Sequence, residues 1–467
     1  MRYLSTRGRA PLLGFEETLL AGLASDGGLY VPETWPALTS RDLAEFAGLG
    51  YAEIAARVMA PFVEGWIDAD ELGDMAAAAY AEFEHDAVTP LVQIADNDWL
   101  LELFHGPTCA FKDIAMQMLG RLFDRALTRR DERVAIVGAT SGDTGSAAIA
   151  GCAGRDRMEL YILFPDGRVS DVQRRQMTTV EATNVHAIAI DGTFDDCQAL
   201  VKAMFGDGPF RRSQNLAAVN SINWARVMAQ IVYYVVAAVR LGAPGRSIAF
   251  SVPSANFGAM FAGFAAQRMG LPIARLIVAT NANDILTRFI ESGDYRKSEV
   301  VRTLSPSMDI QVSSNFERAL FELHGRDAAR IEALMGELKT AGGFSVACEY
   351  AAAARASFDA HRLDDAGIRA EIARILRHSG VLIDPHTACG TAAARATGVA
   401  AEVPVVIHAQ AHPAKFSDAV AAATGQRPAM PERLEQVMNR PERVERLPND
   451  LAAVQAFIET TRTHGGS

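Results

Sequence analysis

Apolar residues recur at helical spacing over residues 41–59 and 68–84, and turn residues separate the two stretches. A spacing of three and four residues places apolar side chains on one face of a helix. Residues 1–92 are therefore expected to form a mainly helical N-terminal domain.

After residue 92 the pattern changes to short apolar, β-branched runs that alternate with helical stretches. Such continuous apolar runs are typical of parallel strands that are buried on both faces. The pattern predicts an α/β fold with open, mostly parallel sheets and helices on both faces. The predicted strands are 134–137, 160–164, 185–190, 248–252, 274–279 and 403–408. The predicted helices are 113–127, 144–152, 195–205, 224–241 and 259–269.

Two α/β domains are expected after the helical one, over residues 93–228 (smaller) and 229–467 (larger). Residues 306–341 mix loop and helix and are interpreted as a peripheral insertion. The charged region from Pro431 onward is expected to end in a surface helix.

Composition and charge argue against several classes of function. The 467 residues include 45 basic and 56 acidic side chains, and the net charge of −11 argues against a nucleic-acid partner. No apolar run reaches the ~20 residues that span a bilayer, so no membrane association is expected. Five widely spaced cysteines without a CxxC pair, and an N-terminus without a signal-peptide core, indicate a reduced, cytoplasmic protein with no metal site.

The segment LFHGPTCAFKD (103–113) places Lys112 after Phe111 at the start of a predicted helix. Partly apolar surroundings and the positive end of the helix dipole both disfavour the ammonium form, and Schiff-base chemistry requires a neutral amine. The alternative is an ordinary exposed lysine. Three other segments that fit the same chemistry favour the first interpretation.

Two of these segments are loops suited to anions. Residues 133–151 (RVAIVGATSGDTGSAAIAG) run from an apolar strand through a glycine-rich loop into a helix, with Ser141 and Thr144 hydroxyls beside free amides. Residues 247–258 (SIAFSVPSANFG) repeat the arrangement. Each could also be a plain strand-to-helix turn. Neither contains GxxxxGKS or GxGxxG, so pyridoxal phosphate acting on an amino acid, with Lys112 anchoring the aldehyde, fits better than a nucleotide.

The third segment is NSINWAR (220–226), where Arg226 lies in the first turn of a predicted helix. It could be a surface arginine. The alternative is that Arg226 and Ser221 bind a second phosphate, for which the two-pronged guanidinium is suited.

With these motifs, the chain resembles the threonine synthase family, pyridoxal-phosphate enzymes of the tryptophan-synthase-β type (PLP fold type II). The resemblance runs nearly end to end, and the N-terminal extension is typical of the longer members. It rests on YLSTRG (3–8), DGGLYVPE (26–33), FHGPTCAFKD (104–113), TSGDTGS (140–146), FPDGRVS (164–170), NSINWAR (220–226), PSANFG (253–258), DPHTACG (384–390) and AHPAKF (411–416).

The resemblance implies a role for each site residue. Lys112 would form the Schiff base with pyridoxal 5′-phosphate. Phe111 and Asp143 would lie near the cofactor ring, and Ser254, Ala255, Asn256, Phe257 and Gly258 would hold its phosphate. Ser141, Gly142 and Thr144 would bind the substrate carboxylate, and Ser221 and Arg226 the substrate phosphate. His105 is a further pocket candidate.

Three positions depart from the family pattern. Ala255 stands where glycine is usual, which requires a negative φ. Asp166 stands where a lysine is expected and cannot help to bind phosphate. Gln410 stands where relatives place a threonine near the pyridine nitrogen; either its amide or the Thr387 hydroxyl would serve the ring.

The implied reaction converts O-phospho-L-homoserine and water to L-threonine and phosphate, by a monomer or homodimer. Two alternatives are a phospholyase or serine/threonine dehydratase of the same fold type, and a non-catalytic ligand-binding descendant. The second-phosphate segment argues against the dehydratase, and the intact Lys112 argues against the silent descendant.

Overall fold

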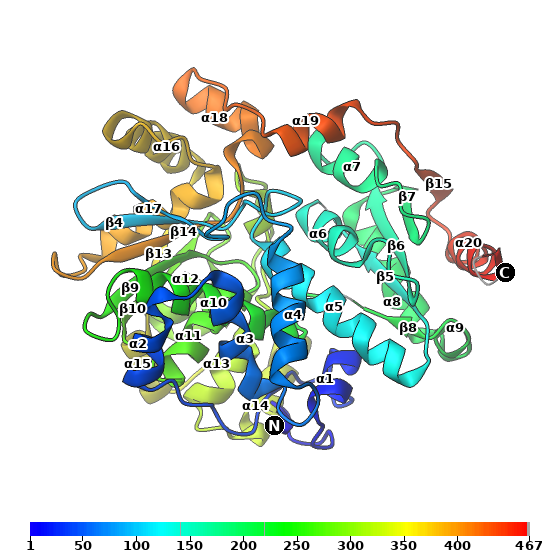
Figure 1. Cartoon of the computed structure of the whole chain (residues 1–467), viewed down its shortest axis with the longest axis horizontal. Coiled ribbons are helices and arrows are strands. Elements are labelled where there is room, and N and C mark those ends of the chain that lie inside the picture. The colour runs from blue at the N-terminus through cyan, green and yellow to red at the C-terminus, as the bar shows by residue number, and fades with distance from the viewer. Residues whose placement is uncertain (141, 219, 465–467) are drawn as a thin grey trace. The chain divides into compact units, whose positions relative to one another are not determined.

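The computed structural model describes residues 1–140, 142–218 and 220–464. The chain divides into two compact units (Figure 1). Unit 1 contains residues 1–19, 23–111 and 221–429, and unit 2 contains residues 20–22, 112–220 and 430–467. This division differs from the three consecutive domains expected. Most of the N-terminal region is grouped with residues 221–429, and the C-terminal region is grouped with residues 112–220.

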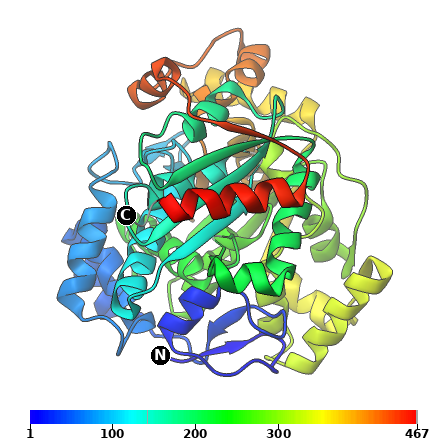
Figure 2. The same cartoon turned by 90° about the vertical axis from the view of Figure 1, so that its right-hand side faces the viewer.

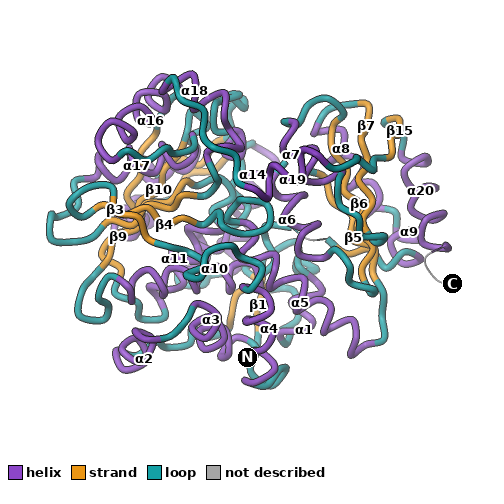
Figure 3. The backbone as a smooth tube through the Cα atoms, turned by 45° about the horizontal axis from the view of Figure 1, so that its top comes forward, coloured by secondary structure: helices purple, strands orange, loops and turns teal. Residues whose placement is uncertain are grey.

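Unit 1 is built on a six-stranded sheet with the order β13-β10-β9-β14-β4-β3, in which only the edge strand β3 is antiparallel. Helices cover both faces of this sheet (Figure 3), as the apolar pattern predicted. Its strands are β3 (Leu91–Gln93), β4 (Asp98–Glu102), β9 (Ile248–Pro253), β10 (Ile273–Thr280), β13 (Phe358–Arg362) and β14 (Val405–Ala409). The covering helices include α10 (Trp224–Arg240), α11 (Gly258–Arg268), α16 (Asp365–Ser379) and α17 (Pro385–Thr397).

The remaining elements of unit 1 lie outside this sheet. They are β1 (Tyr3–Ser5), α1 (Phe15–Ala21), β2 (Tyr30–Pro32), α2 (Ser40–Glu45), α3 (Tyr51–Met59), α4 (Ala69–Tyr80), α12 (Ile285–Ser292), β11 (Asp294–Arg296), α13 (Phe316–Leu323), α14 (Ala328–Ala341), β12 (Gly343–Ser345), α15 (Cys348–Ser357) and α18 (Ser417–Thr424). Four short 3₁₀ turns join them: η1 (Phe46–Gly48), η2 (Ala60–Phe62), η3 (Pro306–Met308) and η4 (Pro413–Phe416).

Unit 2 has a parallel five-stranded sheet with the order β15-β7-β6-β5-β8. Its strands are β5 (Val134–Ala139), β6 (Met158–Pro165), β7 (Val185–Asp191), β8 (Leu216–Ala217) and β15 (Glu445–Pro448). Its helices are α5 (Lys112–Arg130), α6 (Asp143–Cys152), α7 (Asp171–Thr178), α8 (Phe194–Gly206), α9 (Gly208–Ser213), α19 (Glu432–Asn439) and α20 (Leu451–His464).

Most of the N-terminal region is grouped with unit 1. It is mainly helical, as expected, but the expected helix 41–59 is divided into α2, η1 and α3 around Gly48 and Gly50, with Leu49 in an extended conformation. The buried Tyr3 ring packs 5.9 Å from Trp224 of α10, and its hydroxyl donates to the Phe62 carbonyl. Burial of these aromatic rings joins the N-terminal region to unit 1.

The C-terminal region also departs from the expectation. The polar strand β15 pairs in parallel with β7, and the helix α20 packs its buried Val454 and Ile458 on the same sheet of unit 2. Figure 2 shows α20, in red, lying across these strands. The expected surface helix therefore has one face in the core.

Residues 306–341 are not a peripheral insertion. They include fully buried polar side chains, among them Asn315 and Arg318. Burial of an arginine and an asparagine is costly unless both are hydrogen-bonded, so this segment must have a specific environment.

Candidate active site

Lys112 is the first residue of α5, at the end of a loop that is held by residues 410–415. The Phe111 amide donates to the Gln410 carbonyl at 2.8 Å, and the His412 amide donates to the Cys109 carbonyl at 3.1 Å. The buried Lys415 ammonium donates to the Thr108 carbonyl at 2.8 Å. Bonds from a distant segment thus fix the backbone up to the residue before Lys112.

The Lys112 amine faces a carboxylate. Its Nζ lies 3.7 Å from Asp143 Oδ2, and the two side chains are 13% and 3% exposed. The sequence predicted partly apolar surroundings for Lys112, and the Asp143 carboxylate is a polar neighbour in addition to them. Asp143 begins α6, where the helix dipole favours a negative charge.

Gln173 orients that carboxylate. Its Nε2 donates to Asp143 Oδ1 at 3.0 Å, and its Oε1 accepts from the Ser170 hydroxyl at 3.1 Å. Gly142, before Asp143, has φ 152°, and a Cβ there would lie 2.4 Å from Gln173 Nε2. Glycine is therefore required at position 142. Thr144 follows in the first turn of α6 and is half-buried, whereas Ser141 lies outside the described residues.

The loop from Ser254 to Gly258 joins β9 to α11, with Ser254 buried. Within the described part of the chain, the loop amides from Ala255 to Gly258 donate no hydrogen bond. Free amides at a helix N-terminus form an anion site. Positive φ occurs at Phe257 (61°) and not at Ala255, so alanine is tolerated in place of the usual glycine.

Arg226 is not a surface residue. It is 4% exposed, and its Nε and Nη1 have no hydrogen-bond partner among the described residues. Burial lowers the pKa of Arg226 to about 10, so the side chain is still a cation at neutral pH. A buried cation without a partner is costly, so it fits a site that receives an anion. Ser221 is half-buried, five residues before Arg226.

Gln410 is buried just beyond the end of β14, and its Nε2 donates to the carbonyl of Pro253, the last residue of β9, at 2.9 Å. The Thr387 hydroxyl donates to Asp384. The Gln410 amide keeps a second N–H, whereas the Thr387 proton is already engaged, so the geometry favours Gln410 of the two.

His105 pairs with Glu102. Its Nε2 lies 2.8 Å from Glu102 Oε2, and both side chains are about one-fifth exposed. The sequence reading did not identify Gln173, Lys415 or Asn315. The only available signal was that Lys415 belongs to AHPAKF and that Gln173 follows FPDGRVS by three residues.

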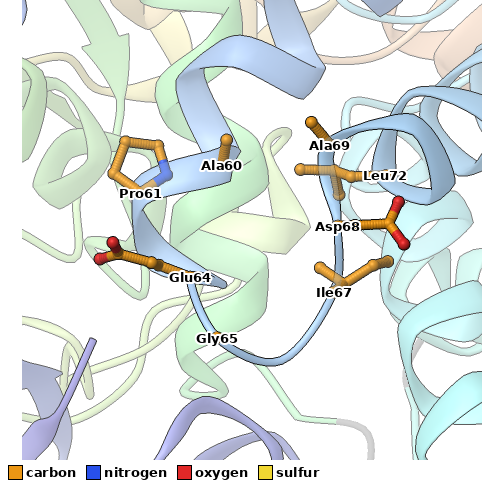
Figure 4. A pocket seen from close by; sticks show the side chains of 8 residues that line it. All are labelled: Ala60, Pro61, Glu64, Gly65, Ile67, Asp68, Ala69 and Leu72. Carbon is orange, nitrogen blue, oxygen red and sulfur yellow. The ribbon is translucent and has the colours of Figure 1, made fainter.

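Features elsewhere are less informative. None of the helices in the described ranges is long and apolar enough to cross a membrane. Those ranges also hold no group of three His, Cys, Asp or Glu side chains placed to bind a metal ion. A surface pocket of about 380 Å³ between η2 and the start of α4 (Figure 4) is lined by none of the candidate residues.

Three family models cover most of the chain. "Threonine synthase N terminus" matches residues 2–80, "Pyridoxal-phosphate dependent enzyme" matches residues 83–363, and "Threonine synthase, C-terminal" matches residues 387–458.

Individual relatives agree with the models. A threonine synthase from Pseudomonas aeruginosa is 54% identical over 466 residues, covering 100% of this chain and 99% of the relative. The crystal structure of threonine synthase with bound pyridoxal phosphate from Brucella melitensis is 52% identical, covers all of both chains and has a TM-score of 0.97. Threonine deaminase isoform 2 from Solanum lycopersicum is 13% identical with a TM-score of 0.54 and covers 77% of this chain and 90% of its own, a likeness of fold alone.

Proposed function

The chain belongs to the threonine synthase family of pyridoxal-phosphate-dependent enzymes, and on this basis we propose how its own residues carry out the reaction. The function is conversion of O-phospho-L-homoserine and water to L-threonine and phosphate. Full-length identity of 54% to a threonine synthase is the observation that carries this function over the dehydratase and phospholyase alternatives.

The residues fit the cofactor. The free amides of the Ala255–Gly258 loop match a phosphate at the N-terminus of α11. Lys112 supplies an amine beside a carboxylate. We assign Lys112 as the cofactor's covalent anchor, Ser254–Gly258 as its phosphate loop, and Phe111, Asp143 and Gln410 as the groups near its ring. When bound, the cofactor serves as an electron sink that lets protons leave the carbons next to the substrate amine.

The substrate's two anionic ends have separate partners. Gly142 and Thr144, with Ser141, receive the carboxylate at the start of α6, where the helix dipole favours an anion. Arg226, with Ser221, binds the phosphate and remains with it as it leaves. Because the Arg226 guanidinium is desolvated before the substrate arrives, its attraction to the phosphate is strong.

Lys112 moves the protons. Once the substrate amine has displaced it, its Nζ is a free base that can accept a proton from carbon and return it to another carbon. Asp143, fixed by Gln173, holds the amine in place between these transfers. His105 stays a weaker candidate, since its ring is already paired with Glu102.

The cellular compartment and the oligomeric state are proposed from fewer observations. The five cysteines are free thiols, which supports a reducing compartment and hence the cytoplasm. We propose a monomer or a homodimer, with the small-molecule substrate as the main partner.

Borohydride reduction of the holoenzyme, followed by peptide mass spectrometry, tests the anchor. The expected result is a pyridoxyl group on the peptide that contains Lys112. Labelling of Lys415, the other buried lysine near this loop, would overturn the assignment.

A further inference from the structure

Asn315 precedes α13 and is completely buried, in a segment that none of the sequence motifs connects with the site. Its side chain makes no helix-capping hydrogen bond. Its polar groups contact other segments of unit 1 instead.

One of these contacts is with the cofactor-phosphate loop. The backbone N–H of Asn315 donates to the Asn256 carbonyl at 3.0 Å. The side-chain Nδ2 of Asn315 lies 3.3 Å from the position that a Cβ on Gly258 would occupy. The neighbouring Ser313 hydroxyl donates to the Ala255 carbonyl. These hydrogen bonds to the loop carbonyls fix the loop backbone and leave the amides of the same loop available for an anion.

The other contact is with the start of the substrate-phosphate segment. Asn315 Nδ2 donates to the Ser221 carbonyl at 3.0 Å. A single residue thus bonds to both segments: its backbone N–H to the loop proposed to bind the cofactor phosphate, and its side chain to the segment proposed to bind the substrate phosphate.

A hydrogen bond from Arg318 holds the Asn315 side chain in this position. Arg318 Nη1 donates to Asn315 Oδ1, its Nη2 donates to the Ile222 carbonyl at 2.6 Å, and its Nε donates to the Tyr30 carbonyl at 3.0 Å. Full burial lowers the pKa of Arg318 to about 9, yet these three acceptors satisfy the cation at neutral pH. A fully satisfied buried network fixes one side-chain geometry.

We propose that Asn315 is a positioning residue that couples the two phosphate sites, so that occupation of the substrate-phosphate site by an anion tightens binding of the cofactor phosphate. The inference rests on the proposed function for Ser221, Arg226 and the Ser254–Gly258 loop. Ordering one backbone segment lowers the cost of ordering the other, and such coupling is reciprocal.

The test measures release of pyridoxal phosphate from the holoenzyme by fluorescence after dilution, with and without saturating 4-phosphooxybutanoate. This compound is the substrate without its amine, so it cannot replace Lys112. In the wild type, the compound should slow cofactor release about fivefold or more.

Asn315→Asp keeps an acceptor for Arg318 but loses the donor to Ser221, so the slowing should fall below about twofold. Asn315→Ser, which is too short to reach Ser221, should do the same and serves if the first variant does not fold. Asn184→Asp in unit 2 is the matched control: Asn184 is a buried asparagine whose Nδ2 donates to the carbonyls of Cys152 and Met158 at 3.0 and 2.8 Å. It should retain the full slowing.

Arg226→Ala distinguishes an error in the proposed function from an error in the proposed coupling. If it still responds to the compound like the wild type, the assignment of Arg226 in the proposed function is wrong. If Arg226→Ala loses the response but both Asn315 variants retain it, the coupling by Asn315 is wrong and the proposed function stands. A wild type without any slowing would also overturn the coupling.

Discussion

Lys112 Nζ lies 3.7 Å from Asp143 Oδ2, and this carboxylate is held through its other oxygen by Gln173. The pair joins the starts of α5 and α6, and α6 directly follows β5, so its N-terminus lies at the carboxyl-end edge of the unit 2 sheet. Ligands of open α/β sheets bind at this edge. The two side chains are 13% and 3% exposed, so this is not a surface ion pair, and we propose that it belongs to the active site.

Lys112→Ala should lower threonine formation by at least about 10³-fold, because no other group would supply the moving amine. The fold should persist, since Lys112 is at a helix start and alanine is a good helix former. Steady-state assay and circular dichroism check both statements. Activity within tenfold of the wild type would show that Lys112 is not the anchor.

Arg226→Met should have opposite effects on stability and binding. The methionine removes a buried, unpartnered cation and fills a similar volume, so the ligand-free protein should become more stable by about 1–3 kcal/mol. The KM for phosphohomoserine should rise at least tenfold, and Arg226→Lys should restore only part of it. Urea unfolding and kinetics measure the two effects. A destabilised Arg226→Met with an unchanged KM would indicate a structural arginine.

Gln410→Glu tests which group faces the cofactor ring. A carboxylate at this position should favour protonation of the ring nitrogen and divert substrate toward keto acids, whereas Gln410→Thr should retain threonine as the main product. Product ratios by chromatography decide between them. An unchanged ratio in Gln410→Glu would favour Thr387, and so would a cofactor-bound structure with no Gln410 nitrogen within ~3.2 Å of the ring nitrogen.

His408 should make the protein sensitive to acid. Complete burial among the rings of Tyr233, Tyr234 and Phe250 lowers the pKa of His408 to about 3. The unfolded chain takes up a proton on this ring near pH 6.5 and the folded protein does not, so its contribution is fully present above pH 6.5 and is lost as the pH falls toward 3. From pH 7.5 to 5.5 the loss should be about 1–1.5 kcal/mol.

The measurement is urea unfolding at these two pH values for the wild type and His408→Phe, which has no titrating group. The difference between the two proteins should grow by that amount in favour of the variant at pH 5.5. If both proteins lose stability equally, the ring is not held neutral in the fold.

Local patterns predicted much of the sheet structure. The apolar runs that became β5, β6, β7, β9, β10 and β14 lie within one or two residues of their predicted positions, because buried parallel strands carry a continuous apolar signal. β15 was missed, since its residues Glu445–Pro448 form a polar edge strand. The membership of residues 430–467 in unit 2 depends on pairing with β7, about 250 residues earlier, which no local pattern encodes.

Local patterns likewise predicted some residues of the candidate site and missed others. Lys112 and the two strand-to-helix loops were found because helix starts and small residues are visible in the sequence. The burial of Arg226 was left open, because a lone arginine in a first turn has no local signature. Gln173 and Asn315 were missed because their importance lies in hydrogen bonds to residues 30 and 94 positions away.

Product analysis shows whether this chain makes threonine from phosphohomoserine. The purified holoenzyme is incubated with O-phospho-L-homoserine, and phosphate, threonine and keto acid are quantified together. We expect phosphate and threonine in equal amounts, with little keto acid. Phosphate accompanied mainly by keto acid, or no phosphate release from an intact holoenzyme, would contradict the proposed function.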